Sequence, residues 1–362
     1  MASALDPVAL LKAAGIFLAF IAFLFVGALV FPGKNELGVA LPDGTRQKYK
    51  LNGFSSFLIV TALTALGCYT ALFSLASLHH LFWPLLVVVN LFAFSFTLYL
   101  VLTGRRKLGG RPGVGGFISD SFYGVEINPN LFGVDLKMFS YRPSLIGLGL
   151  LNVSFAFAQY EAHGLITTRM WLFQIFYFIY LTNYFQFEYG MLYTWDIIAE
   201  KFGWMLVWGD YALVPFFYSV PGWFLIDNLD PMPSWEPPVL CALFALGFWI
   251  FRGTNEQKHR YKVNPQTHIW GKPAQAVGGR LLVSGFWGIG RKLNYTGELC
   301  IYFSWTLTTG FHSIVPYLLP LWLFCLFTHR AWRDDQRCRA KYGPLWVEYC
   351  AHAKFKMFPF IY

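Results

Sequence analysis

Three polar segments near the end of the chain carry residue types that could hold a phosphorylated cofactor. In the first, FRGTNEQKHRYKVNP (251–265), Lys258 and Lys262 lie four residues apart and would share one face of a helix. Two ammonium groups on one face can bind phosphate oxygens through charge-assisted hydrogen bonds. Contact between these lysines and lipid headgroups is the alternative, and the segment alone favours it.

The second segment, LLVSGFWGIGRKLNYTGELC (281–300), sets glycines beside aromatic and amide side chains. Glycine lets a backbone approach a ligand closely. Asn294 and Tyr295 could hydrogen-bond a carboxamide or a ribose, and Trp287 could stack on a planar ring. Core packing with an interfacial anchor is the alternative that needs no ligand.

The third segment, THRAWRDDQRCRAKYGPLWVEYC (328–350), alternates aromatic side chains with charges of both signs. A dense run of charge usually forms a solvated face. Here the alternation, together with an apolar end (355–362) that can return to the body of the protein, favours a lined site.

Carboxylates within or beside apolar stretches form a second set of candidates. Intramembrane ionisable residues are costly and are functional hypotheses by default. Glu188 and Asp210 lie inside such stretches, whereas Asp196 lies at an interfacial one, where solvent exposure is a simple alternative.

Several familiar sites are absent from the sequence. There is no P-loop, and GFWGIG (285–290) has the wrong glycine spacing for a dinucleotide fingerprint. The eight histidines form no clustered boxes of the kind a membrane di-iron centre needs. The six cysteines show no paired spacing, so neither a disulfide framework nor any metal site is predicted.

The elements that must position these residues are apolar helices. The chain is 56% hydrophobic and only 13% charged, and a backbone inside lipid must satisfy its own hydrogen bonds. We therefore predict an all-α, polytopic integral membrane protein. Its first stretch is too long for a signal peptide and is expected to be a retained helix. The nine apolar stretches are 8–31, 54–76, 81–103, 143–161, 168–187, 203–226, 235–252, 295–310 and 311–328.

The net charge of +9 is distributed unevenly. Basic residues gather in the connection around 105–111, in 252–292 and after Arg330, whereas an acidic loop occupies 227–236. The basic face is therefore predicted to be cytoplasmic. Membrane lipids and an anionic cofactor account for this charge better than nucleic acid does, because no soluble basic domain is present.

Composition divides the chain into three predicted parts. Residues 1–142 form N-terminal transmembrane helices, and 253–362 form a cofactor-binding region with the last transmembrane helices. Residues 143–252 are rich in aromatic side chains, which either fill a helical core or line a cavity for a flat apolar ligand.

Six ordered motifs resemble the sterol reductase family, which comprises the C-14 and C-7 sterol reductases (the latter being 7-dehydrocholesterol reductase), the C-24(28) reductase and the membrane domain of the lamin B receptor. The resemblance extends from about residue 50 to the end. The motifs, with the terminal P-x-IY, are LNGF (51–54), FYGVEINP (122–129), TWDIIAEKFGWMLVWGDYALVPFFYS (194–219), N-x-QK (255–258), LLVSGFWG…NY-x-GE (281–298) and HR-x-x-RDD-x-x-C-x-x-KYG-x-x-W-x-x-YC (329–350).

The resemblance implies about ten transmembrane helices, with the additional one near 281–292 or 190–202. It also implies NADPH bound by the C-terminal half and sterol entering from the bilayer. The membrane would be the endoplasmic reticulum or nuclear envelope in a eukaryote and the inner membrane in a bacterium. The implied cofactor contacts are Lys258, Lys262, Leu282, Trp287, Asn294, Tyr295, Arg330, Asp334, Cys338, Arg339, Ala340, Lys341, Tyr342 and Tyr349.

The chain departs from the family pattern at three positions. Lys292 stands where the family usually has histidine, which exchanges a titratable imidazole for a permanent cation. Glu298 stands where aspartate is usual, and Lys262 where arginine is common. The role of position 292 is therefore open.

The implied chemistry is reduction of a sterol carbon–carbon double bond, at C-14 or C-7, by protonation of the alkene and hydride transfer. An acid must face the alkene, and the candidates are Glu188, Asp196, Asp210 and Asp334, or a polarised tyrosine. Aromatic rings can stabilise the cation. The alternatives are an isoprenylcysteine-type membrane methyltransferase that uses S-adenosylmethionine, which also resembles the C-terminal region, and a non-catalytic sterol-binding protein.

Overall fold

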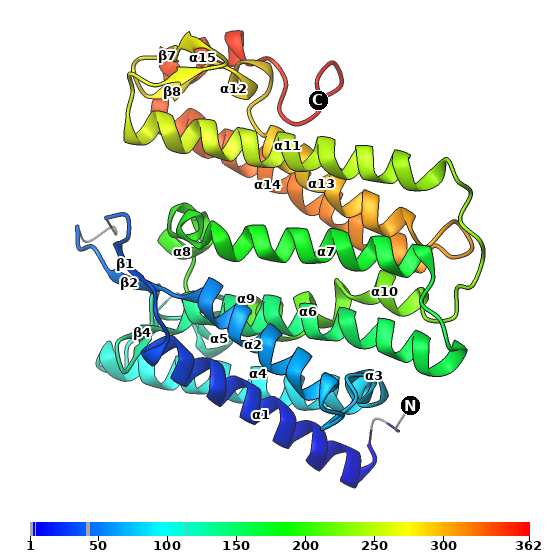
Figure 1. Ribbon diagram of the computed structural model, residues 1–362. Coiled ribbons are helices and arrows are strands. Elements are labelled where there is room, and N and C mark those ends of the chain that lie inside the picture. Colours follow the sequence, from blue (N-terminus) through cyan, green and yellow to red (C-terminus); the bar gives the residue numbers. More distant parts are fainter. Residues whose placement is uncertain (1–2, 4, 41–43, 114) are drawn as a thin grey trace. The chain divides into compact units, whose positions relative to one another are not determined.

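The computed structural model describes residues 3, 5–40, 44–113 and 115–362, which form two compact units (Figure 1). Unit 1 runs from Met1 to Leu229 and unit 2 from Asp230 to Tyr362. Both are mainly helical. The division of the chain at residues 142 and 252 stays a prediction from composition.

Unit 1 consists of helices joined by short connections and two small antiparallel hairpins. The hairpins pair β1 (Lys34–Leu37) with β2 (Lys48–Leu51) and β3 (Asn130–Leu131) with β4 (Val134–Asp135). The helices are α1 (Pro7–Val30), α2 (Gly53–Tyr69), α3 (Ala76–His80), α4 (Phe82–Lys107), α5 (Phe117–Tyr123), α6 (Leu136–His163), α7 (Thr168–Gln186), the 3₁₀ helix η1 (Glu188–Tyr193), α8 (Trp195–Ile198), α9 (Trp204–Trp208), the π-helix η2 (Gly209–Phe217) and α10 (Val220–Phe224).

Helix α6 is the centre of unit 1, because it packs against α1, α3, α7 and η2. Its start is fixed by Asp135, whose carboxylate accepts the Met138 N–H at 2.8 Å and so satisfies a free donor of the first turn. It ends at Gly164, which has a φ of 71° and stops the helix in the left-handed region.

The stretch predicted as one span at 203–226 is helical but broken. It begins as α9, continues as the π-helix η2 and ends in the short α10. Pro215 lies inside η2 and has no N–H to donate, so regular α-helical hydrogen bonding is interrupted there. π-Helical turns are often found at functional sites. Asp210 lies in this π-helical segment.

Neither place suggested for a tenth helix holds a spanning one. Residues 190–202, all described, contain the end of η1 and the four-residue α8. Residues 281–292 contain a two-residue strand and the four-residue α12 (Phe286–Ile289). A crossing needs about 20 residues. The total of nine or ten spans stays a prediction.

A buried lysine fastens the 194–200 segment to α6. Lys137 is fully buried, and its ammonium donates to the carbonyls of Asp196 (2.5 Å), Ile197 (3.1 Å) and Glu200 (2.7 Å). These carbonyls lie in and just after α8, at the end of a helix where they have no partner within it. One side chain thus satisfies three carbonyl acceptors, of which that of Ile197 is buried.

Replacing Lys137 with methionine should destabilise the protein by roughly 2–4 kcal/mol, since one buried and two part-buried carbonyls lose their donor. The check is the thermal unfolding midpoint of the detergent-solubilised variant. Lys34→Met, which changes an exposed lysine of β1, is the control and should unfold like the wild type. Equal midpoints for Lys137→Met and wild type would contradict this role.

Unit 2 has long helices with two hairpins inserted between them. The hairpins pair β5 (His268–Ile269) with β6 (Lys272–Pro273) and β7 (Ala276–Val277) with β8 (Leu281–Leu282). Small strands in both units were not predicted from the sequence. The helices are α11 (Glu236–Val263), α12 (Phe286–Ile289), α13 (Leu293–Leu307), the 3₁₀ turn η3 (Val315–Tyr317), α14 (Leu318–Tyr342) and α15 (Pro344–His352).

Helices α11 and α13 lie side by side through facing glycines (Figure 1). A Cβ at Gly247 would lie 2.8 Å from the Gly297 carbonyl oxygen, and a Cβ at Gly297 would lie 2.5 Å from the Phe251 nitrogen. No larger residue fits at either position without moving a backbone. Small residues at helix contacts are typical of membrane bundles.

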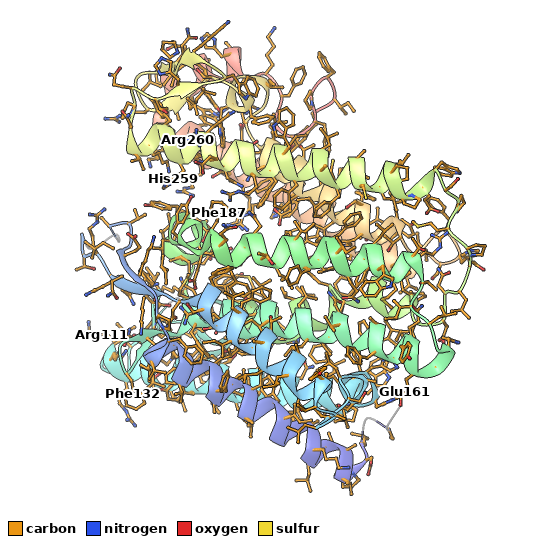
Figure 2. The ribbon with its side chains drawn as sticks, in the orientation of Figure 1. Arg111, Phe132, Glu161, Phe187, His259 and Arg260 are labelled. Carbon is orange, nitrogen blue, oxygen red and sulfur yellow. The ribbon has the colours of Figure 1, made fainter. Side chains whose placement is uncertain are left out.

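Among the described residues, α1, α4 and α11 are each long and apolar enough to cross a membrane. Side chains Leu91, Phe94, Leu98 and Leu102 are exposed along one face of α4, where lipid would cover them. Figure 2 shows Arg111 and Phe132 at one end of unit 1 and Glu161 at the opposite end.

Candidate functional site

The polar end of α11 positions the first group of candidate residues. The helix continues to Val263, and since 28 residues span about 42 Å, its last turns extend beyond a bilayer core of about 30 Å. Lys258 and Lys262 are exposed on these turns, where Figure 2 labels the neighbouring His259 and Arg260. The predicted sharing of a helix face by the two lysines holds, because both lie in one helix.

The glycine-rich segment is fastened to the same end of α11. Gln257 accepts the Phe286 N–H at 2.9 Å, and the Trp287 indole N–H donates to the Thr254 carbonyl at 2.8 Å. Gly285 has a φ of 61°, and a Cβ there would lie 2.4 Å from the Gln257 side-chain oxygen. Only glycine suits this position.

Trp287 brings an aromatic face to a lysine. The Lys258 ammonium lies 4.7 Å from the centre of the Trp287 ring, within the range of a cation–π interaction. The buried side of Trp287 packs with Tyr261, Ile269 and Leu282. Leu282 is thus part of a small core, and Lys258 lies on its exposed side.

The start of α13 and the polar half of α14 are joined by an ion pair. Lys292 donates to the Asp334 carboxylate, whose other oxygen lies 3.9 Å from Arg337. Burial opposes the charge of Lys292, but Tyr295 and Asp334 outweigh it and raise the pKa of the ammonium. Burial likewise opposes the charge of Asp334, but Lys292 and then Lys258 lower the pKa of the carboxyl.

Two residues in the first turn of α13 follow Lys292 in the chain. The Tyr295 ring stacks on Phe327 with centroids 4.9 Å apart, and the Lys292 ammonium lies 6.0 Å from the Tyr295 centroid. The buried side-chain oxygen of Asn294 accepts no hydrogen bond from any described residue. A buried acceptor without a donor is costly, which fits a ligand donor at this position.

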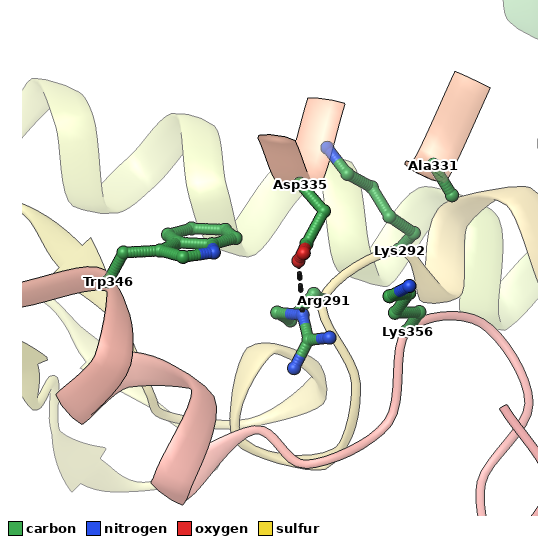
Figure 3. Close-up of a pocket in the computed structure, with 6 residues that line it drawn as sticks. All are labelled: Arg291, Lys292, Ala331, Asp335, Trp346 and Lys356. Atoms are coloured by element: carbon green, nitrogen blue, oxygen red, sulfur yellow. Dashed lines mark ion pairs between the residues drawn. The ribbon is translucent and has the colours of Figure 1, made fainter. Parts of the chain in front are cut away.

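The residues next to Lys292 and Asp334 in the chain form a second ion pair, which the dashed line in Figure 3 marks. Arg291 pairs with Asp335 at 3.4 Å, and both side chains are more than nine-tenths buried. The small pocket around this pair is also lined by Lys292, Ala331, Trp346 and Lys356. Arg291 also donates to the Ala353 carbonyl at 2.6 Å. This pocket joins α14 to the C-terminal tail.

The last candidates lie at the end of α14 and on α15. Tyr349 is buried in a cluster with Val277, Trp346 and Ala353, against which Cys338 and Tyr342 pack. Burial raises the pKa of the Tyr349 hydroxyl. The remaining predicted contacts are on α14: Arg330 is half-buried, and Arg339, Ala340 and Lys341 are exposed.

The structure places all fourteen predicted cofactor residues in unit 2. Tyr295 and Asp334 contact Lys292, and the charge of Lys258, which lies over Trp287, interacts with both Lys292 and Asp334. Tyr349, Tyr342 and Cys338 belong to the adjacent aromatic cluster. A role in cofactor binding stays a prediction for each of them.

Of the four candidate acids, Asp334 is in unit 2 and the others are in unit 1. Glu188 is buried, pairs with Arg142 at 3.3 Å and accepts the Gly53 N–H at 2.8 Å. Its carboxylate has a clear structural function. Asp196 is half-buried, and Asp210 is 7% exposed with no described residue donating a hydrogen bond to its carboxyl.

Lys292, Arg291 and Asp335 are not among the site residues predicted from the sequence. A signal for them exists in the chain. Two adjacent cations at 291–292 and two adjacent carboxylates at 334–335 pair one to one, Arg291 with Asp335 and Lys292 with Asp334. Matched charge doublets at the start of one apolar helix and the end of another predict such a pairing.

The helical architecture, the apolar spans and the polar cluster at the membrane edge define an integral membrane protein of the polytopic class. The chain belongs to the Ergosterol biosynthesis ERG4/ERG24 family, whose model matches residues 8–362. The resemblance found in its motifs is thereby confirmed.

Relatives from several kingdoms match nearly the whole chain. A Delta(14)-sterol reductase of Arabidopsis thaliana is 37% identical and covers 95% of this chain and 94% of its own. A Delta(14)-sterol reductase of Methylotuvimicrobium alcaliphilum is 41% identical, covering 97% and 83%. The 7-dehydrocholesterol reductase of Xenopus laevis is 30% identical, covering 91% and 74%.

Proposed function

We propose that this protein reduces a carbon–carbon double bond of a sterol with NADPH, most readily the C-14 double bond. The family match over residues 8–362 carries the proposal, and relatives at 37% and 41% identity are Delta(14)-sterol reductases. The 7-dehydrocholesterol reductase at 30% identity makes C-7 the second candidate position.

The residues of unit 2 fit a phosphorylated dinucleotide. Exposed Lys258, Lys262 and Lys341 offer charge-assisted hydrogen bonds to phosphate. The unpartnered oxygen of Asn294 suits the N–H groups of a carboxamide, and Tyr295 offers an aromatic face and a hydroxyl. When bound there, NADPH supplies the hydride. The basic character of this end of unit 2 supports a cofactor site that opens to the cytoplasm.

Within unit 1 we assign the role of proton donor to Asp210. Glu188 is committed to Arg142 and to the Gly53 N–H, whereas no described residue donates to the buried carboxyl of Asp210. A carboxyl group free of such bonds can keep its proton on oxygen and give it to an alkene. Asp334 is held in its charged form by Lys292, which suits a residue that positions the cofactor.

The decisive experiment incubates the purified protein with NADPH and a panel of Δ7, Δ14 and Δ24 sterols and identifies the products by mass. We expect a gain of two hydrogens on the Δ14 sterol and oxidation of one NADPH for each. Binding of S-adenosylmethionine with no effect of NADPH would instead support a methyltransferase, which the family match disfavours. Sterol binding without turnover of any substrate would support a non-catalytic protein.

A further inference from the structure

The backbone of Lys292 is fixed by the C-terminal tail. Its N–H donates to the Lys356 carbonyl at 2.7 Å, and the Arg291 N–H donates to the Phe355 carbonyl at 3.0 Å. The Thr296 hydroxyl donates to the Met357 carbonyl at 2.5 Å, one turn further along α13. The tail therefore accepts three hydrogen bonds from residues at and around position 292. These bonds restrict the backbone and the Cα–Cβ direction of Lys292.

The tip of the Lys292 side chain is fixed as well. Its ammonium donates to Asp334 on α14, and the side chain is only 15% exposed. The charged and titratable groups that face this pair come from every surrounding element: Lys258 from α11, Tyr295 from α13, Cys338 and Arg337 from α14, and Lys356 from the tail. Arg291 and Asp335 form the neighbouring ion pair, and the charges of Arg330 and Glu298 act on Tyr295. Burial, and then Lys292, lower the pKa of Lys258 to about 7.

We propose that Lys292 is a positioning residue for the reaction: it holds Asp334 as a fixed carboxylate between α13 and α14, and so sets the charge that a bound nucleotide meets. The inference rests on the proposed function only for the identity of the nucleotide. The ion pair and the hydrogen bonds from residues 291–296 to the tail do not depend on which nucleotide binds.

The consequence for pH follows from the surroundings of Asp334. Lys292 is the main cause that lowers the pKa of this carboxyl, against burial, which raises it. Without the Lys292 ammonium, Lys258 and Arg337 are the remaining cations that lower this pKa, so the pKa of Asp334 is higher in the variant than in wild type. Because the folded variant then takes up this proton at a higher pH than the folded wild type does, its stability relative to wild type improves as pH falls.

The test compares Lys292→Met with wild type from pH 4, near the pKa of about 3.9 of an aspartate in an unfolded chain, to pH 8. Without nucleotide, the thermal midpoint of Lys292→Met should lie furthest below wild type at pH 8 and approach it as the pH falls. The variant should bind NADPH about tenfold more weakly than wild type at pH 8, and this difference should shrink as Asp334 takes up a proton. Lys292→Arg should restore the wild-type behaviour in both measurements.

Lys354→Met is the matched control, since Lys354 is an exposed lysine of the same tail and should show no such pH dependence. Combining Lys292→Met with Asp334→Asn should abolish the pH dependence. Lys292→Gln repeats the test with a polar side chain if the methionine variant does not fold. A midpoint difference from wild type that is the same at every pH would overturn the proposal, whether or not the protein binds NADPH.

Discussion

Asp210→Asn should lower kcat for sterol reduction by about 100-fold or more, the range that a general acid contributes, while the Kd for NADPH stays unchanged. Asparagine has nearly the same shape as aspartate but has no carboxyl proton to give. Because Asp210 is buried in the π-helix η2 and no described residue donates to its carboxyl, the substitution breaks no hydrogen bond from a described residue to this side chain. Single-turnover kinetics with a Δ14 sterol measure this step directly.

Asp227→Asn provides the control for this experiment. Asp227 is an exposed carboxylate of the same unit that contacts His163 at 3.2 Å, and its loss should leave turnover at the wild-type rate. A fully active Asp210→Asn variant would refute Asp210 as the proton donor and leave Asp196 and Asp334 as the candidates. A variant with low kcat and an equally weakened NADPH affinity would also count against a role confined to proton transfer.

Lys258→Met should weaken NADPH binding by about 10- to 100-fold, because a charge-assisted hydrogen bond to phosphate contributes roughly 1.5–3 kcal/mol. Methionine keeps much of the aliphatic length of the side chain but loses the ammonium that lies 4.7 Å from the Trp287 ring. Fluorescence titration of the purified protein gives the Kd. The dependence of Kd on salt should also become shallower.

The matched control is Lys272→Met, which removes an exposed ammonium from strand β6 in the same unit. We expect this variant to bind NADPH like the wild type. If Lys258→Met and Lys272→Met bind equally well, Lys258 is an ordinary membrane-edge lysine, which is the alternative that the sequence segment itself favoured.

Much of the architecture could be predicted because bilayer physics restricts it. Apolar stretches predicted at 8–31, 168–187 and 235–252 lie in α1, α7 and α11. The break of 203–226 into three helical pieces was not predicted, since hydropathy averages over a window and does not register how Pro215 redirects hydrogen bonds. The small hairpins carry too few residues to produce a periodic signal.

Residues of the candidate site could be predicted only where the residue type alone indicates a binding role. Lys258 and Trp287 were singled out by residue type. The pairing of Lys292 with Asp334 joins residues 42 positions apart in the chain, and the charge doublets at 291–292 and 334–335 indicate it only once α13 and α14 are known to be neighbours. The burial of Tyr349 and Leu282 was equally hidden, because it depends on which hairpin covers which helix.

The facing glycines of α11 and α13 have a consequence for how this protein responds to its lipid environment. Interlocked backbones cannot slide along each other, so a thicker or thinner bilayer must tilt the two helices together. Lys258 follows Gly247 on α11, and Tyr295 precedes Gly297 on α13. The distance between Lys258 and Tyr295 should therefore stay the same when the composition of the surrounding lipid changes.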